Sequence, residues 1–249
     1  MSSAPAISLP SGIFRCVEVD PPWQYRDRSF NGTNSTQRQR SHCPYPTMPI
    51  RDLFLMKSEV QRLLHPDGAH LWLWTTKDFL PQAFAIVEHW GFEFKQVFTW
   101  LKTRPRTSLV GVGKQVLDFI PEAGLRAAER KRRAETLAEV LAEKIRIVGI
   151  PTFGMGSWGR GATEFILFAT TNPKMRLVNA TREPNLFTAP RGAHSAKPAE
   201  AYDLIARNSP GPRCSLFQRT PRPGFVCWGN ELIAEDPAAR LSSDRRSRT

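Results

Sequence analysis

The stretch that decides the fold is FRCVEVDPPW, residues 14–23. Its first six residues alternate in polarity and include two valines, a pattern that predicts a strand over residues 14–19. The two prolines that follow have no N–H group and hold the backbone extended, so we expect their carbonyls to stay open to hydrogen bonds. The strand therefore delivers the Asp20 carboxylate and the Trp23 ring to one place at its carboxyl end.

This corner suits a flat ring that carries an exocyclic amino group. The carboxylate of Asp20 and the carbonyl of Pro21 can accept the two amino hydrogens, while the ring stacks on Trp23. Adenine and cytosine are rings of this kind. The tetrapeptide from Asp20 to Trp23, with Pro22 fixing the turn, is therefore the candidate catalytic site.

Predicted strands and helices alternate along the chain after this first strand. The pattern predicts helices at 49–65, 79–90 and 199–207, and further strands at 70–75, 93–101, 164–169, 186–187 and 213–218, while residues 226–228 end the folded region. A β-α-β-α-β order indicates a mostly parallel sheet with helices on its faces. The fold class is therefore α/β.

The chain has one expected folded domain, residues 13–231. Residues 1–12 are rich in Ser, Pro and Ala and predict a flexible arm, and residues 232–249 lack large apolar side chains and predict a disordered tail. The segment at about 104–150 is rich in Ala, Glu, Arg and Leu, which indicates an inserted basic helix.

The net charge of +12 indicates a polyanionic partner, and nucleic acid is the first candidate. Two basic groups are the expected phosphate contacts; the alternative is a solvated basic surface. They are a long polar loop with Arg26, Arg28, Arg38 and Arg40, and the run Arg130, Lys131, Arg132 and Arg133.

Other compositional features exclude several classes of protein. No run approaches the length of a membrane span, and the N-terminus lacks the pattern of a signal peptide. The four cysteines lie far apart without a Cys-x-x-Cys pair, so we expect reduced thiols, no metal site and a cytoplasmic protein. Residues 154–159 fit G-x-G-x-x-G, but a strand follows where a dinucleotide site needs a helix.

Two motifs near the C-terminus favour ligand contacts. Lys197 precedes a helix, where a positive charge is unfavourable, so it should have an anionic partner unless it is an ordinary exposed lysine. Asn230 and Glu231 place an amide beside a carboxylate, a pair that can hold a ribose and an adenine edge or form a simple surface turn.

Taken together, the motifs resemble the adenine-N6 methyltransferase family named for the 70 kDa MT-A subunit of the messenger-RNA methyltransferase, with the bacterial and phage branch the closest likeness. The likeness covers about residues 13–231 apart from the insertion. The matching segments, in chain order, are VDPPW (19–23), YPTM (45–48), LWLWT (71–75), WGF (90–92), WLKT (100–103), the glycine loop (154–159), APR (189–191), HSAKP (194–198), PGP (210–212), LFQR (216–219) and WGNE (228–231).

This resemblance implies a Rossmann-like methyltransferase fold with permuted motif order. The implied sheet is mostly parallel and seven-stranded, with helices on both faces and one antiparallel edge strand. The implied cofactor is S-adenosylmethionine, without a metal, and the implied reaction is methylation of the N6 amino group of adenine in DNA. By position, Lys197 would pair with the methionyl carboxylate of the cofactor. The other contacts of the cofactor would come from Asp20, Arg219, Asn230 and Glu231.

The resemblance leaves alternatives open. The substrate could be RNA instead of DNA, or the chain could be a family member that binds nucleic acid without catalysis. Cytosine as the target rests on the tetrapeptide alone. Ser215 stands where some members have an acidic cofactor contact, which departs from the family pattern.

Overall fold

The computed structural model describes residues 9–25, 46–103, 161–192 and 196–229, together with residues 126, 128–129, 132–133, 136 and 232. The glycine loop at 154–159 and most of the expected insertion lie outside the described residues. The chain divides into two compact units. Unit 1 spans Met1–Phe98, Phe165–Asn185 and Tyr202–Thr249, and unit 2 spans Thr99–Glu164 and Leu186–Ala201.

Within the described residues, seven strands form one sheet in the order β5-β3-β4-β2-β1-β6-β7. Pairing is parallel for β1 with β2 and β6, for β6 with β7 and for β3 with β5, which confirms the mostly parallel Rossmann-like sheet. The strands are β1 (Cys16–Val19), β2 (His70–Thr75), β3 (Glu93–Thr103), β4 (Thr163–Thr170), β5 (Leu186–Pro190), β6 (Arg213–Leu216) and β7 (Val226–Trp228).

The antiparallel strand is β4, and its position differs from the one expected. It pairs with β2, and the strand order puts β3 and β5 beyond it, so it lies inside the sheet and not at an edge. The resemblance implied one antiparallel strand, but the place of a strand in a sheet is set by its long-range pairing, which here is with β2.

Four described helices accompany these strands: α2 (Ile50–Leu55), α3 (Lys57–Arg62), α4 (Leu80–His89) and α7 (Ala199–Asn208). The single helix expected at 49–65 is two helices, because the backbone tightens at Met56, where ψ is −1°. The tightening lets Leu53, Met56 and Val60 all be buried. In the described part of the chain, no helix has both the length and the apolar run needed to cross a bilayer.

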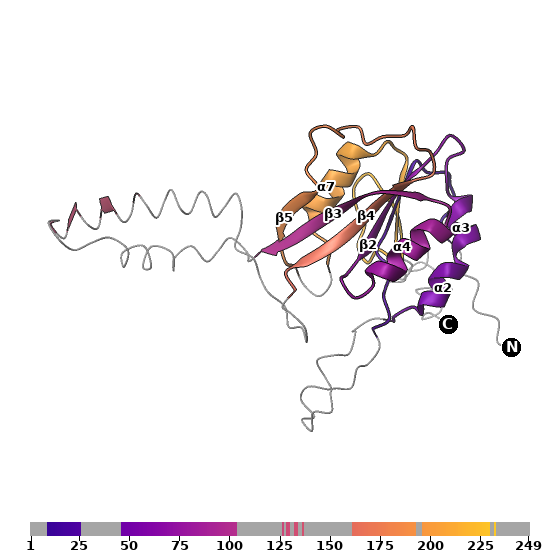
Figure 1. Cartoon of the computed structure of the whole chain (residues 1–249), viewed down its shortest axis with the longest axis horizontal. Coiled ribbons are helices and arrows are strands. Elements are labelled where there is room, and N and C mark those ends of the chain that lie inside the picture. Colours follow the sequence, from indigo (N-terminus) through magenta and orange to yellow (C-terminus); the bar gives the residue numbers. More distant parts are fainter. Residues whose placement is uncertain are drawn as a thin grey trace, which may run out of the picture. The chain divides into compact units, whose positions relative to one another are not determined.

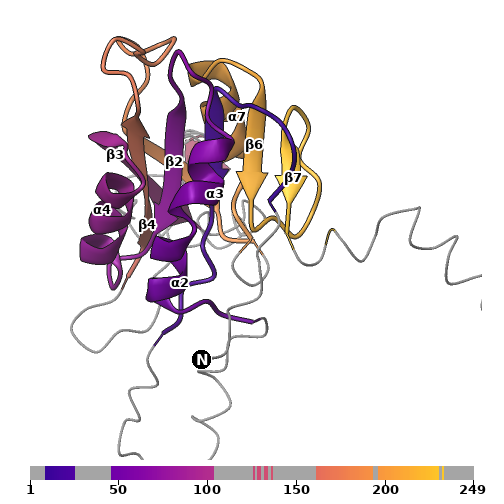
Figure 2. The ribbon, with the colours of Figure 1, turned by 90° about the vertical axis from the view of Figure 1, so that its right-hand side faces the viewer.

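The strands of unit 1 present different residues to their two faces, as alternation along a strand requires. Val17 and Leu71 point into the apolar core with α2, α3 and α4, which Figure 1 and Figure 2 show near β2. The opposite face carries Glu18, His70 and Trp72. His70 and Trp72 contact Ser209, just after α7, and Glu18 contacts Gln218, whose amide also bonds to Tyr202 of α7. Helices therefore cover both faces.

His70 is the centre of a buried polar cluster on the α7 side. Its Nδ1 lies 2.9 Å from the Ser209 hydroxyl and its Nε2 lies 3.0 Å from the Met175 carbonyl. The indole N–H of Trp72 donates to the same hydroxyl at 2.8 Å. A neutral imidazole satisfies both contacts, donating from Nε2 and accepting at Nδ1. Burial lowers the pKa of His70, which keeps this neutral form.

We expect stability to fall as the pH drops below 6.5, the ordinary pKa of histidine. The unfolded chain takes up a proton there while folded His70 stays neutral, so protonation favours unfolding until the pH passes the lowered folded pKa. Urea unfolding of wild type and His70→Gln, at about pH 7.5 and about pH 5, measures this effect. The variant should lose less stability over this interval than wild type. Equal losses in both proteins would contradict the assignment.

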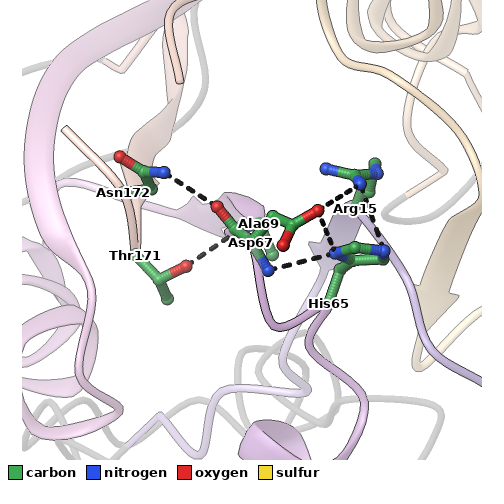
Figure 3. A network of polar contacts seen from close by, with 6 residues as sticks. All are labelled: Arg15, His65, Asp67, Ala69, Thr171 and Asn172. Carbon is green, nitrogen blue, oxygen red and sulfur yellow. Dashed lines mark hydrogen bonds and ion pairs between the residues drawn. The ribbon is translucent and has the colours of Figure 1, made fainter. Parts of the chain in front are cut away.

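A polar network braces the amino ends of β1 and β2 (Figure 3). Nη2 of Arg15 donates to the Asp67 carboxylate at 2.9 Å and lies 3.1 Å from Nε2 of His65. The amide of Asn172, just after β4, donates to the Asp67 carbonyl at 2.8 Å. Between these residues Gly68 has φ +130°, and a Cβ there would lie 2.6 Å from the Cβ of Asn172. The turn therefore needs glycine. Because this network occupies the amino ends of β1 and β2, the candidate site is sought at their carboxyl ends.

Candidate active site

Asp20 lies at the carboxyl end of a central strand of unit 1. It follows Val19, the last residue of β1, and β1 has parallel neighbours on both sides, β2 and β6. The backbone N–H of Asp20 donates to the carbonyl of Leu216 at the end of β6 at 3.4 Å. In open parallel sheets, ligands bind at the carboxyl ends of the strands. The half-buried side chain of Asp20 is therefore placed where a ligand site is expected.

The two prolines after Asp20 form a tight turn whose carbonyls already accept hydrogen bonds. The Trp23 N–H donates to the Pro21 carbonyl at 2.8 Å, and the Met48 N–H donates to the Pro22 carbonyl at 2.8 Å. This corrects the expectation that both carbonyls stay open: the chain turns back within three residues to reach the Pro21 carbonyl, and the segment before α2 reaches the Pro22 carbonyl. A carbonyl oxygen has two lone pairs, so the Pro21 oxygen keeps a position for one further donor.

The Trp23 ring is part of the core, which corrects the expectation of an open stacking surface. Only 6% of the residue is exposed, and the ring stacks on Phe79 at 5.0 Å between centroids and 13° between planes. Its indole N–H donates to the Trp74 carbonyl at 3.2 Å. The ring is covered because a large apolar surface gains more from burial than from exposure. Trp23 therefore fixes the wall of the corner.

Tyr25 is the exposed aromatic residue beside this wall, and the sequence interpretation missed it. The residue is 51% exposed, and its ring meets Phe79 edge-on at 4.8 Å. A hydrogen bond of 3.2 Å joins its hydroxyl to that of Thr76, just after β2. The spacing Trp23-x-Tyr25 directly after the prolines was the signal that could have revealed it.

A buried polar network lies beside Asp20 on the α7 face. Glu18 is fully buried, opposite Ser215 in the register of β1 and β6, and it accepts hydrogen bonds from the Ser215 hydroxyl and, at 3.2 Å, from the amide of Gln218. The same amide lies 2.5 Å from the hydroxyl of Tyr202 in α7. Ser215, which departs from the family pattern, therefore stands against a carboxylate supplied by β1.

Tyr202 shows how the carboxylates of this network act together. Burial raises the pKa of its phenol, and the negative charges of Glu18 and Asp20 raise it further. Tyr202 therefore stays neutral and can donate a hydrogen bond. The sequence signal for this network was a glutamate at an inward position of a buried strand, since such a charge needs partners.

The loop after β6 passes against the end of β7 with almost no space between them. The Gln218 N–H donates to the Trp228 carbonyl at 2.9 Å, and a Cβ at Gly229 would lie 1.9 Å from the Gln218 carbonyl oxygen. The turn begins at Phe217, which has φ 64°, an uncommon conformation for a residue with a side chain. Arg219, an expected cofactor contact, lies half-buried on this turn.

Lys197 belongs to an ion cluster in unit 2. Its ammonium group lies 3.3 Å from the carboxylate of Glu164, which confirms the expected anionic partner. The other oxygen of Glu164 lies 2.6 Å from the ammonium of Lys102. Burial raises the pKa of the Glu164 carboxyl, but the two ammonium groups outweigh burial and hold that pKa below its usual value. Glu164 is therefore ionised at neutral pH.

Most of the expected nucleic-acid contacts lie outside the described residues. Of the described pair in the basic run, Arg133 donates to Glu129 one helical turn earlier at 2.8 Å, and Arg132 is exposed. In the described residues, no three His, Cys, Asp or Glu side chains are grouped to hold a metal ion. Arg26, Arg28, Arg38, Arg40, Arg130, Lys131, Asn230 and Glu231 lie outside the described residues.

Comparison with known proteins adds two findings. The family model MT-A70 matches residues 14–117 and 134–231, ranges that include Asp20, Lys197 and Arg219. The chain is also similar to the type II methyltransferase M.MunI of Mycoplasma sp, with 23% identity over 237 residues. That alignment covers 90% of this chain and 80% of the relative.

Proposed function

The chain belongs to the MT-A70 family and is a methyltransferase, and from this premise we propose that it methylates the N6 amino group of adenine in DNA with S-adenosylmethionine as the methyl donor. The observation that carries the proposal is the corner at the end of β1. There the Asp20 carboxylate and the second lone pair of the Pro21 carbonyl lie one residue apart, at the carboxyl end of a parallel strand.

The two acceptors match the two hydrogens of an adenine amino group. This nitrogen is a poor nucleophile because its lone pair is delocalised into the ring. Hydrogen bonds to Asp20 and Pro21 would favour a pyramidal nitrogen and localise the lone pair on it. When bound, the donor would supply a methyl group on a sulfonium, and the sulfur would leave with the bonding electrons as the nitrogen attacks that methyl group. The nitrogen gains positive charge as the methyl group is transferred, so its proton becomes acidic and the Asp20 carboxylate would accept it without being a strong base.

Each unit, taken by itself, holds described residues that suit one part of the donor. In unit 1, the missing side chain of Gly229 lets the backbones after β6 and β7 close together at the carboxyl ends of parallel strands, which is a usual position for a nucleoside. The resemblance assigns the ribose and adenine of the donor to Arg219, Asn230 and Glu231, of which the structure describes Arg219. In unit 2, Lys197 offers an ammonium for the methionyl carboxylate.

The charge of the chain supports a nucleic acid substrate. A net charge of +12 favours binding to a phosphate backbone, and the arginines of residues 26–40 and the run at 130–133 are the proposed contacts. A base in a duplex must leave the stack before it can reach Asp20, at a cost of a few kcal/mol. The resemblance to the bacterial and phage branch favours DNA over RNA.

The experiment that tests this function is methyl transfer from labelled S-adenosylmethionine to separate DNA and RNA substrates, followed by nucleoside analysis. We expect label in DNA as N6-methyladenine. Label in RNA alone would assign the RNA alternative, and label in cytosine would reject adenine as the target. Binding of nucleic acid without any transfer would identify a non-catalytic family member.

A further inference from the structure

Three side chains of unit 2 form a single ion cluster, which we call the lysine–glutamate trio: Lys102, Glu164 and Lys197. Each carboxylate oxygen of Glu164 faces one ammonium group, at 2.6 Å for Lys102 and at 3.3 Å for Lys197. The three side chains are 19%, 13% and 9% exposed in that order. Because the trio is largely shielded from water, its charges interact strongly with one another.

The local structure fixes each member of the trio. Lys102 lies near the end of β3, and its ammonium is 5.1 Å from the ring centre of Trp100. Trp100 is itself held by an indole hydrogen bond to the Ala189 carbonyl of β5 at 3.0 Å. Glu164 is the second residue of β4. Lys197 stands just before α7, where the positive end of the helix repels an ammonium, so Glu164 offsets that repulsion.

The charges of the trio have a simple consequence for Lys197. If Glu164 paired with Lys197 alone, it would cancel the positive charge of Lys197. It would also repel a second carboxylate, such as that of a ligand, brought to the same ammonium. Here Lys102 shares the carboxylate, so the trio carries two positive charges and one negative charge. The sum of these three charges is one positive charge.

We propose that Lys102 is a specificity-determining residue for the methyl donor: by neutralising Glu164, it preserves the attraction of Lys197 for the carboxylate of the donor. Glu164 positions the Lys197 ammonium, and Lys102 compensates the charge that this positioning introduces. The inference rests on the proposed function, because it takes S-adenosylmethionine as the ligand of Lys197. It adds roles for two residues, Lys102 and Glu164, that the sequence motifs did not assign.

The test is a double-mutant cycle that changes the charge of the trio while keeping the shapes of the side chains similar. The charge is +1 in wild type, 0 in Lys102→Met, +2 in Glu164→Gln and +1 again in the double variant. Calorimetric titration measures the Kd of two probes. S-adenosylhomocysteine carries the amino-acid tail with its carboxylate, and 5′-methylthioadenosine keeps the nucleoside and sulfur without that tail.

We expect affinity for S-adenosylhomocysteine to follow the charge of the trio. Lys102→Met should weaken the affinity for S-adenosylhomocysteine by about tenfold, which is the size expected when one unit charge near a bound carboxylate is removed in a partly shielded site. Glu164→Gln should bind it several-fold more tightly, and the double variant should return to within about twofold of wild type. The direction of the change in affinity assigns the effect to the carboxylate of the probe. Its amino group is positive and would bind less tightly, not more tightly, when the charge of the trio rises. Affinity for 5′-methylthioadenosine should stay unchanged throughout.

A merely structural trio would give a different pattern. Both single variants would then bind both probes less tightly, and the double variant would bind them least tightly of all. That result would overturn the inference. Glu183→Gln is the matched control, because Glu183 forms an ion pair with Arg207 at 2.7 Å but has no proposed contact with the donor. It should leave both affinities unchanged. A wild-type protein that binds neither probe would overturn the proposed function and the inference together, whereas wild-type binding without the charge pattern would overturn the inference alone.

Discussion

Asp20→Ala is expected to reduce kcat for methyl transfer by about a hundred- to a thousandfold, the usual loss when a polar group that acts in the transition state is removed. The substitution removes the acceptor for one amino hydrogen and the group that holds the departing proton. Asp20→Asn keeps an oxygen that can accept the hydrogen bond but lacks the charge. We expect it to be intermediate, with a loss of about tenfold.

The control for Asp20 is Asp78→Asn, which changes an exposed carboxylate that pairs with its neighbour Lys77. This variant should keep the activity of wild type. Far-UV circular dichroism and urea unfolding of Asp20→Ala show whether the variant is folded. Wild-type activity in Asp20→Ala would reject the corner as the catalytic site.

Trp23→Ala is expected to destabilise the protein by about 3–5 kcal/mol, the usual cost of removing a large aromatic side chain from a core. The ring is buried against Phe79, and truncation also removes the donor to the Trp74 carbonyl. Since total stabilities are about 5–15 kcal/mol, this loss would remove a large fraction of the stability of the protein. Urea unfolding measures it.

A second substitution separates packing from base stacking. Trp23→Phe keeps an aromatic ring but loses volume and the indole donor, so we expect a smaller loss of stability with activity retained at low temperature. Phe84→Ala, which removes a partly exposed ring, is the comparison and should cost less than Trp23→Ala. If Trp23→Ala left stability unchanged and abolished base binding, the stacking role would be restored.

Local patterns explain what could be predicted from the sequence. The strand at His70–Thr75 was predicted to the residue, because a short buried run with clear breakers needs no information from elsewhere. The helices at Leu80–His89 and Ala199–Asn208 were predicted to within one residue or so, because their apolar spacing is helical. The corner at Asp20 was found for the same reason, since strand, carboxylate and prolines follow one another directly.

Long-range contacts explain what could not be predicted. Glu18 and Ser215 are partners across 197 residues, and only the register of β1 with β6 brings them together. The sharing of Glu164 by Lys102 and Lys197 likewise depends on the end of one strand and the start of another. The buried state of Trp23 depends on Phe79, which no local pattern connects to it.

The central position of β1 has a consequence for synthesis of the chain on the ribosome. Glu18 and its partner Ser215 are 197 residues apart, so β6 completes the register with β1 long after β1 itself has been made. At roughly 5–20 residues per second, β1 waits about 10–40 s with one hydrogen-bonding edge unpaired. A nascent chain that stalls in this interval presents that edge, with the Glu18 carboxylate lacking its Ser215 and Gln218 contacts, and an unpaired edge of this kind can pair with a strand of another chain.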